Sequence, residues 1–302
     1  MYLEFYELKD EPFRLTPDPK FLQLAEPHRH ALKTLSQAVT AHKGLMLFTG
    51  PIGTGKTTIL NVLLSVLSQT FQPTELLTAL IVNPRMSRDE FLEALLAEFE
   101  LPCTASKSSR IVGLHALLFA VSKAGGTCLL VVDEAHLLSP DVLEEIRLLM
   151  NADTHRDKPL QVVLCGQPEL STLLREPGLR AVQQRIAARA SLRELSLSET
   201  RMYISERLRV AGLTKPLPFS LSSLERIHEY TGGVPRLINI LADSCLSIGC
   251  ETKRKQIHDD IVEEAALQNE LQVPESAVDP ATPVVSALDN LQLITSTSRS
   301  QL

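Results

Sequence analysis

The feature that most constrains this chain is a glycine-rich segment that fits the pattern G-x-x-x-x-G-K-[ST]. The segment consists of Gly50-Pro51-Ile52-Gly53-Thr54-Gly55-Lys56-Thr57. An apolar run at 44–49 precedes it and is typical of a buried strand, and an apolar helical pattern begins at Thr58. Between a strand and a helix N-terminus, such a loop directs backbone N–H groups and the helix dipole at an anion. The pattern therefore predicts a site for the phosphates of a nucleoside triphosphate.

The candidate nucleotide-binding residues are this loop together with Thr58. Lys56 is expected to reach the β- and γ-phosphates, and the Thr57 hydroxyl is expected to ligate Mg²⁺. The sequence contains no N-K-x-D segment, which would specify guanine. The expected ligand is therefore ATP with Mg²⁺.

A second motif places two acids at the end of an apolar run, Leu129-Leu130-Val131-Val132-Asp133-Glu134. The four apolar residues predict a buried strand, and α/β sheets bind ligands at the carboxyl ends of their strands. We expect Asp133 to hold the magnesium ion and Glu134 to orient and deprotonate the attacking water. Adjacent acids in this position favour an ATPase over a kinase with a separate acceptor site.

Polar residues also follow two other predicted strands. Asn83 follows an apolar run at 79–82, and Gln167 follows the run at 160–166. We expect Asn83 to hydrogen-bond Glu134 and hold it inactive until a partner engages, and Gln167 to position the lytic water or sense the γ-phosphate. Both residues also fit an ordinary strand-end cap. We interpret His136 as a hydrogen-bonding residue rather than a metal ligand, because no second pair of ligands lies nearby.

Composition argues against several other classes of protein. Aromatic residues make up 4% of the 302 residues and Trp is absent, which disfavours a stacking platform for single-stranded nucleic acid. The net charge of −6 argues mildly against a general polyanion binder. The five cysteines form no C-x-x-C pair, which suits a reducing cytoplasm and offers no zinc site. No signal peptide is evident, and no apolar stretch of about 18 residues predicts a membrane span.

The apolar periodicity predicts an α/β protein with a parallel sheet covered by helices, followed by a small helical domain. Strands are expected at 45–49, 78–83, 127–133, 160–166 and 190–195, and helices at 27–42, 56–69, 87–98, 109–123, 140–151 and 168–187. Further helices are expected at 198–211, 220–231, 234–250 and 258–271. The predicted divisions are an extended lead-in at 1–25, a nucleotide-binding domain at 26–197, a helical lid at 198–272 and a disordered tail at 273–302.

The order of these motifs resembles the AAA+ ATPases. The glycine-rich loop and the Asp-Glu pair (Walker A and Walker B) are followed by a polar sensor on the next strand and a helical lid containing Gly232-Gly233-Val234-Pro235-Arg236. Further segments resemble the ExeA/general secretion pathway protein A branch: Met1-Tyr2-Leu3-Glu4-Phe5-Tyr6 with Pro12-Phe13, Thr16-Pro17-Asp18-Pro19 and His28; Gly166-Gln167-Pro168-Glu169-Leu170; and Gln184-Arg185-Ile186. The resemblance covers about residues 1–270 and implies a P-loop NTPase sheet followed by a small α-helical lid.

The resemblance also implies roles for two arginines. Arg236 matches the sensor-2 arginine, which reaches from the lid to the γ-phosphate of its own nucleotide and stabilises the transferring phosphoryl group. Arg185 matches the arginine finger, which completes the site of a neighbouring copy. Arg180 and Arg189 are alternatives for this finger, because one predicted helical stretch carries all three.

The two ends of the chain carry further expectations. The lead-in, with Tyr2, Phe13 and Pro17, resembles the part that covers the adenine in this family. By resemblance, the secretion protein continues into a transmembrane helix and a peptidoglycan-binding region. This chain is instead expected to end in a polar tail without a span, and to lie in the cytoplasm or be recruited peripherally to the inner membrane by a partner.

Three functions are compatible with these expectations. The first is an ATP hydrolase that forms a nucleotide-dependent ring or filament of identical copies and remodels a protein partner of a secretion or envelope system. The second is a DNA-associated AAA+ regulator of the transposition or helicase-loader type, which the acidic charge and the lack of an obvious appended DNA-binding domain disfavour. The third is a nucleotide-gated scaffold in which turnover serves only to disassemble the complex.

Overall fold

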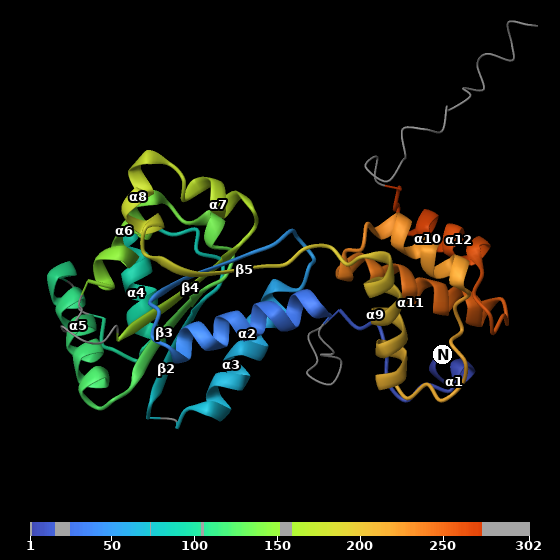
Figure 1. Cartoon of the computed structure of the whole chain (residues 1–302), viewed down its shortest axis with the longest axis horizontal. Helices are drawn as coiled ribbons and strands as arrows, with labels where there is room; N and C mark the ends of the chain where they lie inside the picture. Colours follow the sequence, from blue (N-terminus) through green and yellow to red (C-terminus); the bar gives the residue numbers. More distant parts are fainter. Residues whose placement is uncertain (1, 16–24, 73, 104–105, 152–158, 274–302) are drawn as a thin grey trace, which may run out of the picture.

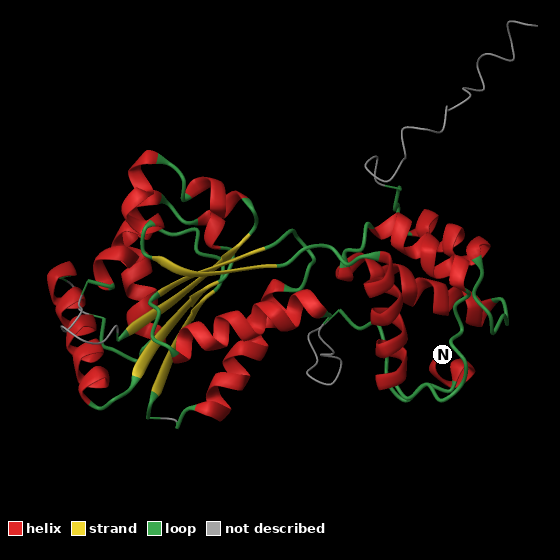
Figure 2. Cartoon of the chain, in the orientation of Figure 1, coloured by secondary structure: helices red, strands yellow, loops and turns green. Residues whose placement is uncertain are grey.

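The computed structural model describes residues 2–15, 25–72, 74–103, 106–151 and 159–273. It consists of an α/β part built on one sheet and a helical part beside it (Figures 1 and 2). Pro17 and the predicted disordered tail from 274 onward lie outside the described residues. None of the helices in the described ranges is long and apolar enough to span a bilayer.

The sheet is fully parallel, with the strand order β2-β3-β4-β1-β5. Its strands are β1 (Leu45–Thr49), β2 (Leu76–Ile81), β3 (Thr127–Val132), β4 (Leu160–Gly166) and β5 (Ile186–Ser191). All residues of β3 and β4 are buried, as expected for central strands of a sheet covered on both faces. Because β3, β4 and β1 are adjacent and parallel, the loop after β1 and the acids after β3 emerge at the same edge of the sheet.

Alternate residues of each strand pack into two separate cores. Met46 and Phe48 of β1 contact helices α2 (Glu26–Thr40) and α3 (Lys56–Thr70), while Leu45 and Leu47 pack on the opposite side. That side is covered by α4 (Arg88–Glu98), α5 (Lys107–Lys123) and α6 (Pro140–Leu149). The result is a sheet covered by helices on both faces, as predicted. The prediction was possible because strands that are buried on both faces carry nearly continuous apolar runs.

The helical part consists of α9 (Leu197–Val210), α10 (Leu221–Thr231), α11 (Pro235–Glu251) and α12 (Asp259–Gln268). Each of these four helices begins within two residues of the start that the sequence predicted. Ser196 caps α9 in a reciprocal arrangement with Glu199, and Ser220 caps α10. Their apolar faces share one core, which includes Ile204, Ile238 and Leu246.

The first residues of the chain pack against this helical part rather than against the sheet. Tyr2–Tyr6 form a helix, α1, within the segment that the sequence predicted to be extended. The Tyr2 hydroxyl donates to Asp243 Oδ1 at 2.5 Å, and burial raises the pKa of both groups. Phe13 is buried in the same core, with 2% of its surface exposed. Tyr2 and Phe13 therefore stabilise the helical part by packing into it.

Two predicted elements differ from the structure around residues 168–191. The expected helix at 168–187 is broken into α7 (Glu169–Leu173), a short turn η3 (Pro177–Leu179) and α8 (Arg180–Gln183), because a proline inside a helix removes a hydrogen bond and clashes with the preceding turn. β5 begins four residues before the predicted strand at 190–195. It lies at the edge of the sheet with alternating burial, so its polar residues concealed it from a search for apolar runs.

Candidate active site

The glycine-rich loop joins β1 to the N-terminus of α3. Helix α3 begins at Lys56, and Gly55 precedes it with a backbone φ of 97°, a left-handed conformation that favours glycine. The loop is anchored to the sheet, because the Gly50 N–H donates to the Gly166 carbonyl of β4 at 3.2 Å. The N-terminal N–H groups of α3 therefore lie where β1 and β4 end, the position expected for a phosphate site.

Lys56 lies within this loop and is 6% exposed. Its Nζ donates to the Gly50 carbonyl at 2.8 Å and to the Pro51 carbonyl at 3.0 Å. These two loop carbonyls thus hold the ammonium group beside the expected phosphate position, where a bound triphosphate would replace them as its hydrogen-bond acceptor. A charged donor already held near the phosphate position needs only a small side-chain movement to bind the anion.

The two predicted metal ligands are in contact. The Thr57 hydroxyl donates to Asp133 Oδ2 at 2.7 Å, although the two residues lie 76 positions apart. The other carboxylate oxygen, Oδ1, accepts the Glu134 N–H at 2.9 Å, which fixes the orientation of the carboxylate. Mg²⁺ prefers oxygen ligands and is usually held by one or two protein groups together with phosphates and water. A hydroxyl and a buried carboxylate in contact beside the loop fit this requirement.

Glu134 emerges from β3 at a sharp turn. Its φ is 52°, and a short turn, η2 (Ala135–Leu137), follows. Glu134 Oε2 lies 3.4 Å from His136 Nδ1, and His136 Nε2 lies 3.1 Å from the side-chain amide nitrogen of Gln167. The structure therefore brings together three polar residues that follow β3 and β4: the predicted base, the predicted sensor and a histidine between them.

Asn83 occupies the same level of the sheet as Glu134. Ile81 of β2 pairs with Val132 of β3. Asn83 follows Ile81 by two positions, and Glu134 follows Val132 by two positions. Asn83 has a φ of 59° and is exposed. Within the described part of the chain, no hydrogen bond joins Asn83 to Glu134, so its proposed switching role stays a prediction.

Helix α11 places Arg236 against the loop. The Arg236 N–H donates to the Gly53 carbonyl at 3.2 Å, and Val234 also lies beside Gly53. The Arg236 side chain is exposed and starts next to the phosphate loop of its own chain. This placement is compatible with the sensor-2 role that the resemblance implies.

The three candidate finger arginines occupy different elements. Arg180 begins α8, Arg185 lies between α8 and β5, and Arg189 lies within β5, so the expectation that one helical stretch carries all three is corrected. Arg185 donates to the side chain of Asn151. None of the three hydrogen-bonds the glycine-rich loop among the described residues, so the choice between them stays open.

His28 of α2 contacts the glycine-rich loop, a role that the sequence analysis missed. It is 7% exposed, and its Nε2 lies 2.8 Å from the Thr54 carbonyl oxygen. Since a carbonyl only accepts, Nε2 carries the proton. The two groups of a trans peptide point in opposite directions, so fixing the Thr54 carbonyl directs the Gly55 N–H the other way. His28 appeared in the sequence only as part of a family resemblance, and no local pattern linked it to the loop.

Replacement of His28 is expected to loosen the loop. In His28→Ala the buried Thr54 carbonyl loses its donor, which costs about 1–3 kcal/mol of unfolding free energy. Burial lowers the pKa of His28, so the unfolded chain binds a proton more readily than the folded one, and stability declines as the pH falls below about 6.5. Denaturant unfolding at several pH values measures both effects. His28→Gln keeps an amide donor but does not titrate, so its stability should fall less steeply with decreasing pH than that of the wild type. If the pH dependence of stability in His28→Gln equalled that of the wild type, the assignment would be contradicted.

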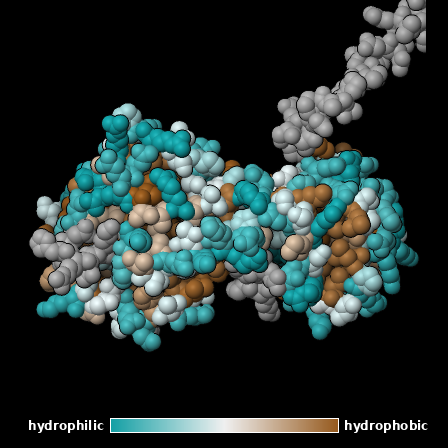
Figure 3. Space-filling model, in the orientation of Figure 1, coloured by the Kyte–Doolittle hydropathy of each residue, from teal (hydrophilic) through white to brown (hydrophobic). Residues whose placement is uncertain are grey.

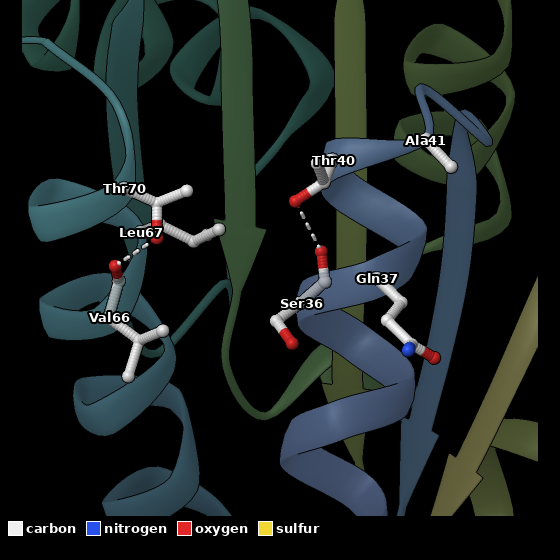
Figure 4. A pocket seen from close by; sticks show the side chains of 7 residues that line it. All are labelled: Ser36, Gln37, Thr40, Ala41, Val66, Leu67 and Thr70. Atoms are coloured by element: carbon white, nitrogen blue, oxygen red, sulfur yellow. Dashed lines mark hydrogen bonds between the residues drawn. The ribbon is translucent and has the colours of Figure 1, made fainter.

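A groove of about 490 Å³ lies away from the loop, between α2 and α3 (Figure 4). The Thr40 hydroxyl donates to the Ser36 carbonyl at 2.9 Å, and the Thr70 hydroxyl donates to the Val66 carbonyl at 2.8 Å. Because both hydroxyls are bound to their own helices, they do not point into the groove as donors. Apolar surface also lies over α3 in the space-filling view (Figure 3). Neither threonine hydroxyl is therefore available as a donor to a small molecule in the groove.

Comparisons with known proteins point to the same family as the resemblance in the sequence. Residues 39–174 match the AAA domain family. The chain is 40% identical over 264 residues to general secretion pathway protein A of Aeromonas hydrophila, a match that covers 86% of this chain and 47% of that protein. The chain is an AAA+ relative of general secretion pathway protein A. It spans about half the length of this curated relative.

Solved structures show the same fold. The Aeropyrum pernix ORC2 protein is 17% identical with a TM-score of 0.65, over 87% of this chain and 72% of that one. The RuvB Holliday junction branch migration motor of Thermotoga maritima is 20% identical with a TM-score of 0.56, over 87% and 75% of the two chains. These similarities confirm the predicted AAA+ sheet with its following helices.

Proposed function

We propose that this AAA+ protein hydrolyses ATP at the interface between neighbouring copies, and that the cycle assembles or remodels a protein complex of a secretion or envelope system. The observation that carries the catalytic part is the hydrogen bond between Thr57 and Asp133. It joins the phosphate loop to the acidic strand end, so that one Mg²⁺ could contact both residues and the triphosphate. Glu134 follows directly and is the proposed general base.

The 40% identity to general secretion pathway protein A supports the secretion or envelope partner. The domains proposed for this cycle are a nucleotide-binding domain at 26–197 and a lid at 198–272. The contact between Arg236 and Gly53 supports a lid that responds to nucleotide, because α11 would move with the loop. We place the protein on the cytoplasmic side of the inner membrane, attached through its partner.

The interface site is tested by mixing two inactive variants. Arg185→Ala is expected to lower the turnover number about 10³-fold, as for other arginine fingers. If Arg185 acts in trans, a mixture of Arg185→Ala and Glu134→Gln proteins forms some sites with an intact base from one copy and an intact finger from the other. A 1:1 mixture that assembles at random should then recover about a quarter of wild-type turnover.

Arg180→Ala and Arg189→Ala are the matched comparisons in the mixing experiment. If the recovery occurs with one of these in place of Arg185→Ala, the finger is reassigned to that residue. An absence of recovery with all three variants would contradict hydrolysis between copies.

The partner class is tested separately with the wild-type protein. ATP-dependent oligomerisation that is unaffected by duplex DNA is expected. Salt-sensitive binding to duplex DNA together with stimulated hydrolysis would contradict the secretion assignment and favour a DNA-associated regulator.

A further inference from the structure

We propose that the groove between α2 and α3 binds residues 284–294 of this protein as a short amphipathic helix. The groove is formed by described residues, whereas 284–294 lie outside them and enter the argument through their sequence alone. The inference goes beyond the ATPase activity and does not depend on it.

The groove offers aliphatic surface, although four of its seven lining residues are polar. The Ser36 hydroxyl donates to the Lys33 carbonyl at 3.1 Å, and the Thr40 and Thr70 hydroxyls donate to carbonyls of their own helices. A polar occupant would therefore gain no donor from these three hydroxyls, and an apolar occupant would leave their hydrogen bonds intact. Val66, in the wall formed by α3, is 37% exposed, so apolar surface remains to be covered (Figure 4).

The two helices that form the groove carry almost no negative charge. Glu26 begins α2 and pairs with Arg29, but residues 27–74 contain no Asp or Glu. Lys33 is exposed and lies about one turn before the lining residues of α2. The charge around the groove therefore favours an apolar occupant with acidic residues beside it.

The C-terminal residues have this complementary composition. Residues 274–298 contain Glu275, Asp279 and Asp289 and no Lys, Arg or His. Within them, apolar residues recur at the spacing of one helix face, namely Val284, Ala287, Leu288, Leu291 and Ile294. Pro283 precedes this stripe, and proline is favoured in the first turn of a helix. The pattern predicts an amphipathic helix of about three turns.

Such a short helix needs a surface to cover its apolar face. A helix of fewer than about 12 residues is marginal alone in water, so a segment like this orders only on binding. This explains how 284–294 can be part of a tail that the sequence predicts to be disordered and still have a specific binding site.

The dimensions of the segment and the groove agree. The lining residues of α2 extend from Ser36 to Ala41, a rise of about 7.5 Å. Leu288 and Leu291 are separated by a rise of about 4.5 Å, so both fit within this length. Residues 274–283 connect the segment to the described part of the chain and can extend about 33–36 Å. This length allows the segment to bind away from α12, on its own chain or on a neighbouring copy.

Amide hydrogen exchange in the full-length chain tests the docking. In the wild type, the amides of 285–294 are expected to exchange at least about 10-fold more slowly than in a random coil. Leu288→Asp places a charge in the apolar stripe and should restore the random-coil rate. Leu293→Asp is the matched control, because residue 293 follows Leu291 by two positions and lies on the opposite side of the helix. This variant should keep the slow exchange.

A second pair of variants identifies the binding surface. Val66→Asp introduces a negative charge into the wall of the groove at a partly exposed position, and it should release the segment. Val112→Asp makes the same change on α5, where Val112 is 66% exposed, and should leave the segment bound. Leu288→Asp changes none of the described residues, so its result stands even if Val66→Asp does not fold.

Three results would overturn the inference. Random-coil exchange of 285–294 in the wild type would show that the segment does not dock. Slow exchange that persists in Val66→Asp would place the segment on another surface. Protection of 36–41 and 66–70 that rises with protein concentration and persists in Leu288→Asp would show that a second copy covers the groove instead.

Discussion

The Glu134→Gln protein is expected to bind ATP with nearly wild-type affinity and to hydrolyse it about 10²- to 10⁴-fold more slowly. Glutamine has the same shape as glutamate but cannot accept a proton from the attacking water. The fold should tolerate the change, because the hydrogen bond from residue 134 to Asp133 Oδ1 uses the backbone N–H. Turnover is measured by phosphate release, and affinity by titration of a fluorescent nucleotide.

Two variants serve as controls for this result. Glu93→Gln removes an exposed carboxylate of α4 that pairs with Arg110, away from the loop, and should leave turnover unchanged. Asp133→Asn should instead weaken the dependence of nucleotide binding on Mg²⁺, because it removes the charge of the proposed metal ligand. Nearly normal turnover in purified Glu134→Gln would refute the assignment of Glu134 as the base.

Lys56→Ala is expected to weaken ATP binding about 100- to 1,000-fold, a loss of roughly 3–4 kcal/mol. The variant loses a buried cation that is expected to bind the β- and γ-phosphates, and charge-assisted hydrogen bonds are about twice as strong as neutral ones. Isothermal titration with ATP and with ADP measures the change. The loss should be larger for ATP, since the γ-phosphate is contacted only in the triphosphate.

The matched control for this prediction is Lys123→Ala, at the last residue of α5. It removes the same charge from the chain without touching the loop, so its affinity should equal that of the wild type. Lys56→Ala also frees the Gly50 and Pro51 carbonyls, so its folding is checked by thermal unfolding. A well-folded Lys56→Ala protein that binds ATP normally would show that residues 50–57 do not hold the triphosphate.

Much of the fold could be predicted because its signals are local and periodic. β1 and β4 have the bounds that the apolar runs predicted, and α3 begins at the expected Lys56. The signals failed where a strand is only half-buried or a helix is interrupted. β5 carries exposed polar residues at the sheet edge, and Pro177 breaks the expected helix.

By itself, the sequence determined the chemical groups of this protein and their order along the chain. The glycine-rich loop, its lysine and the acidic pair after β3 are each encoded within a few consecutive residues. Only the tertiary structure decided which distant groups lie together: His28 on Thr54, His136 and Gln167 beside Glu134, and the first helix against the helical part. These contacts depend on how strands and helices pack across the chain, because local periodicity specifies which face of an element is buried but not which side chain lies opposite.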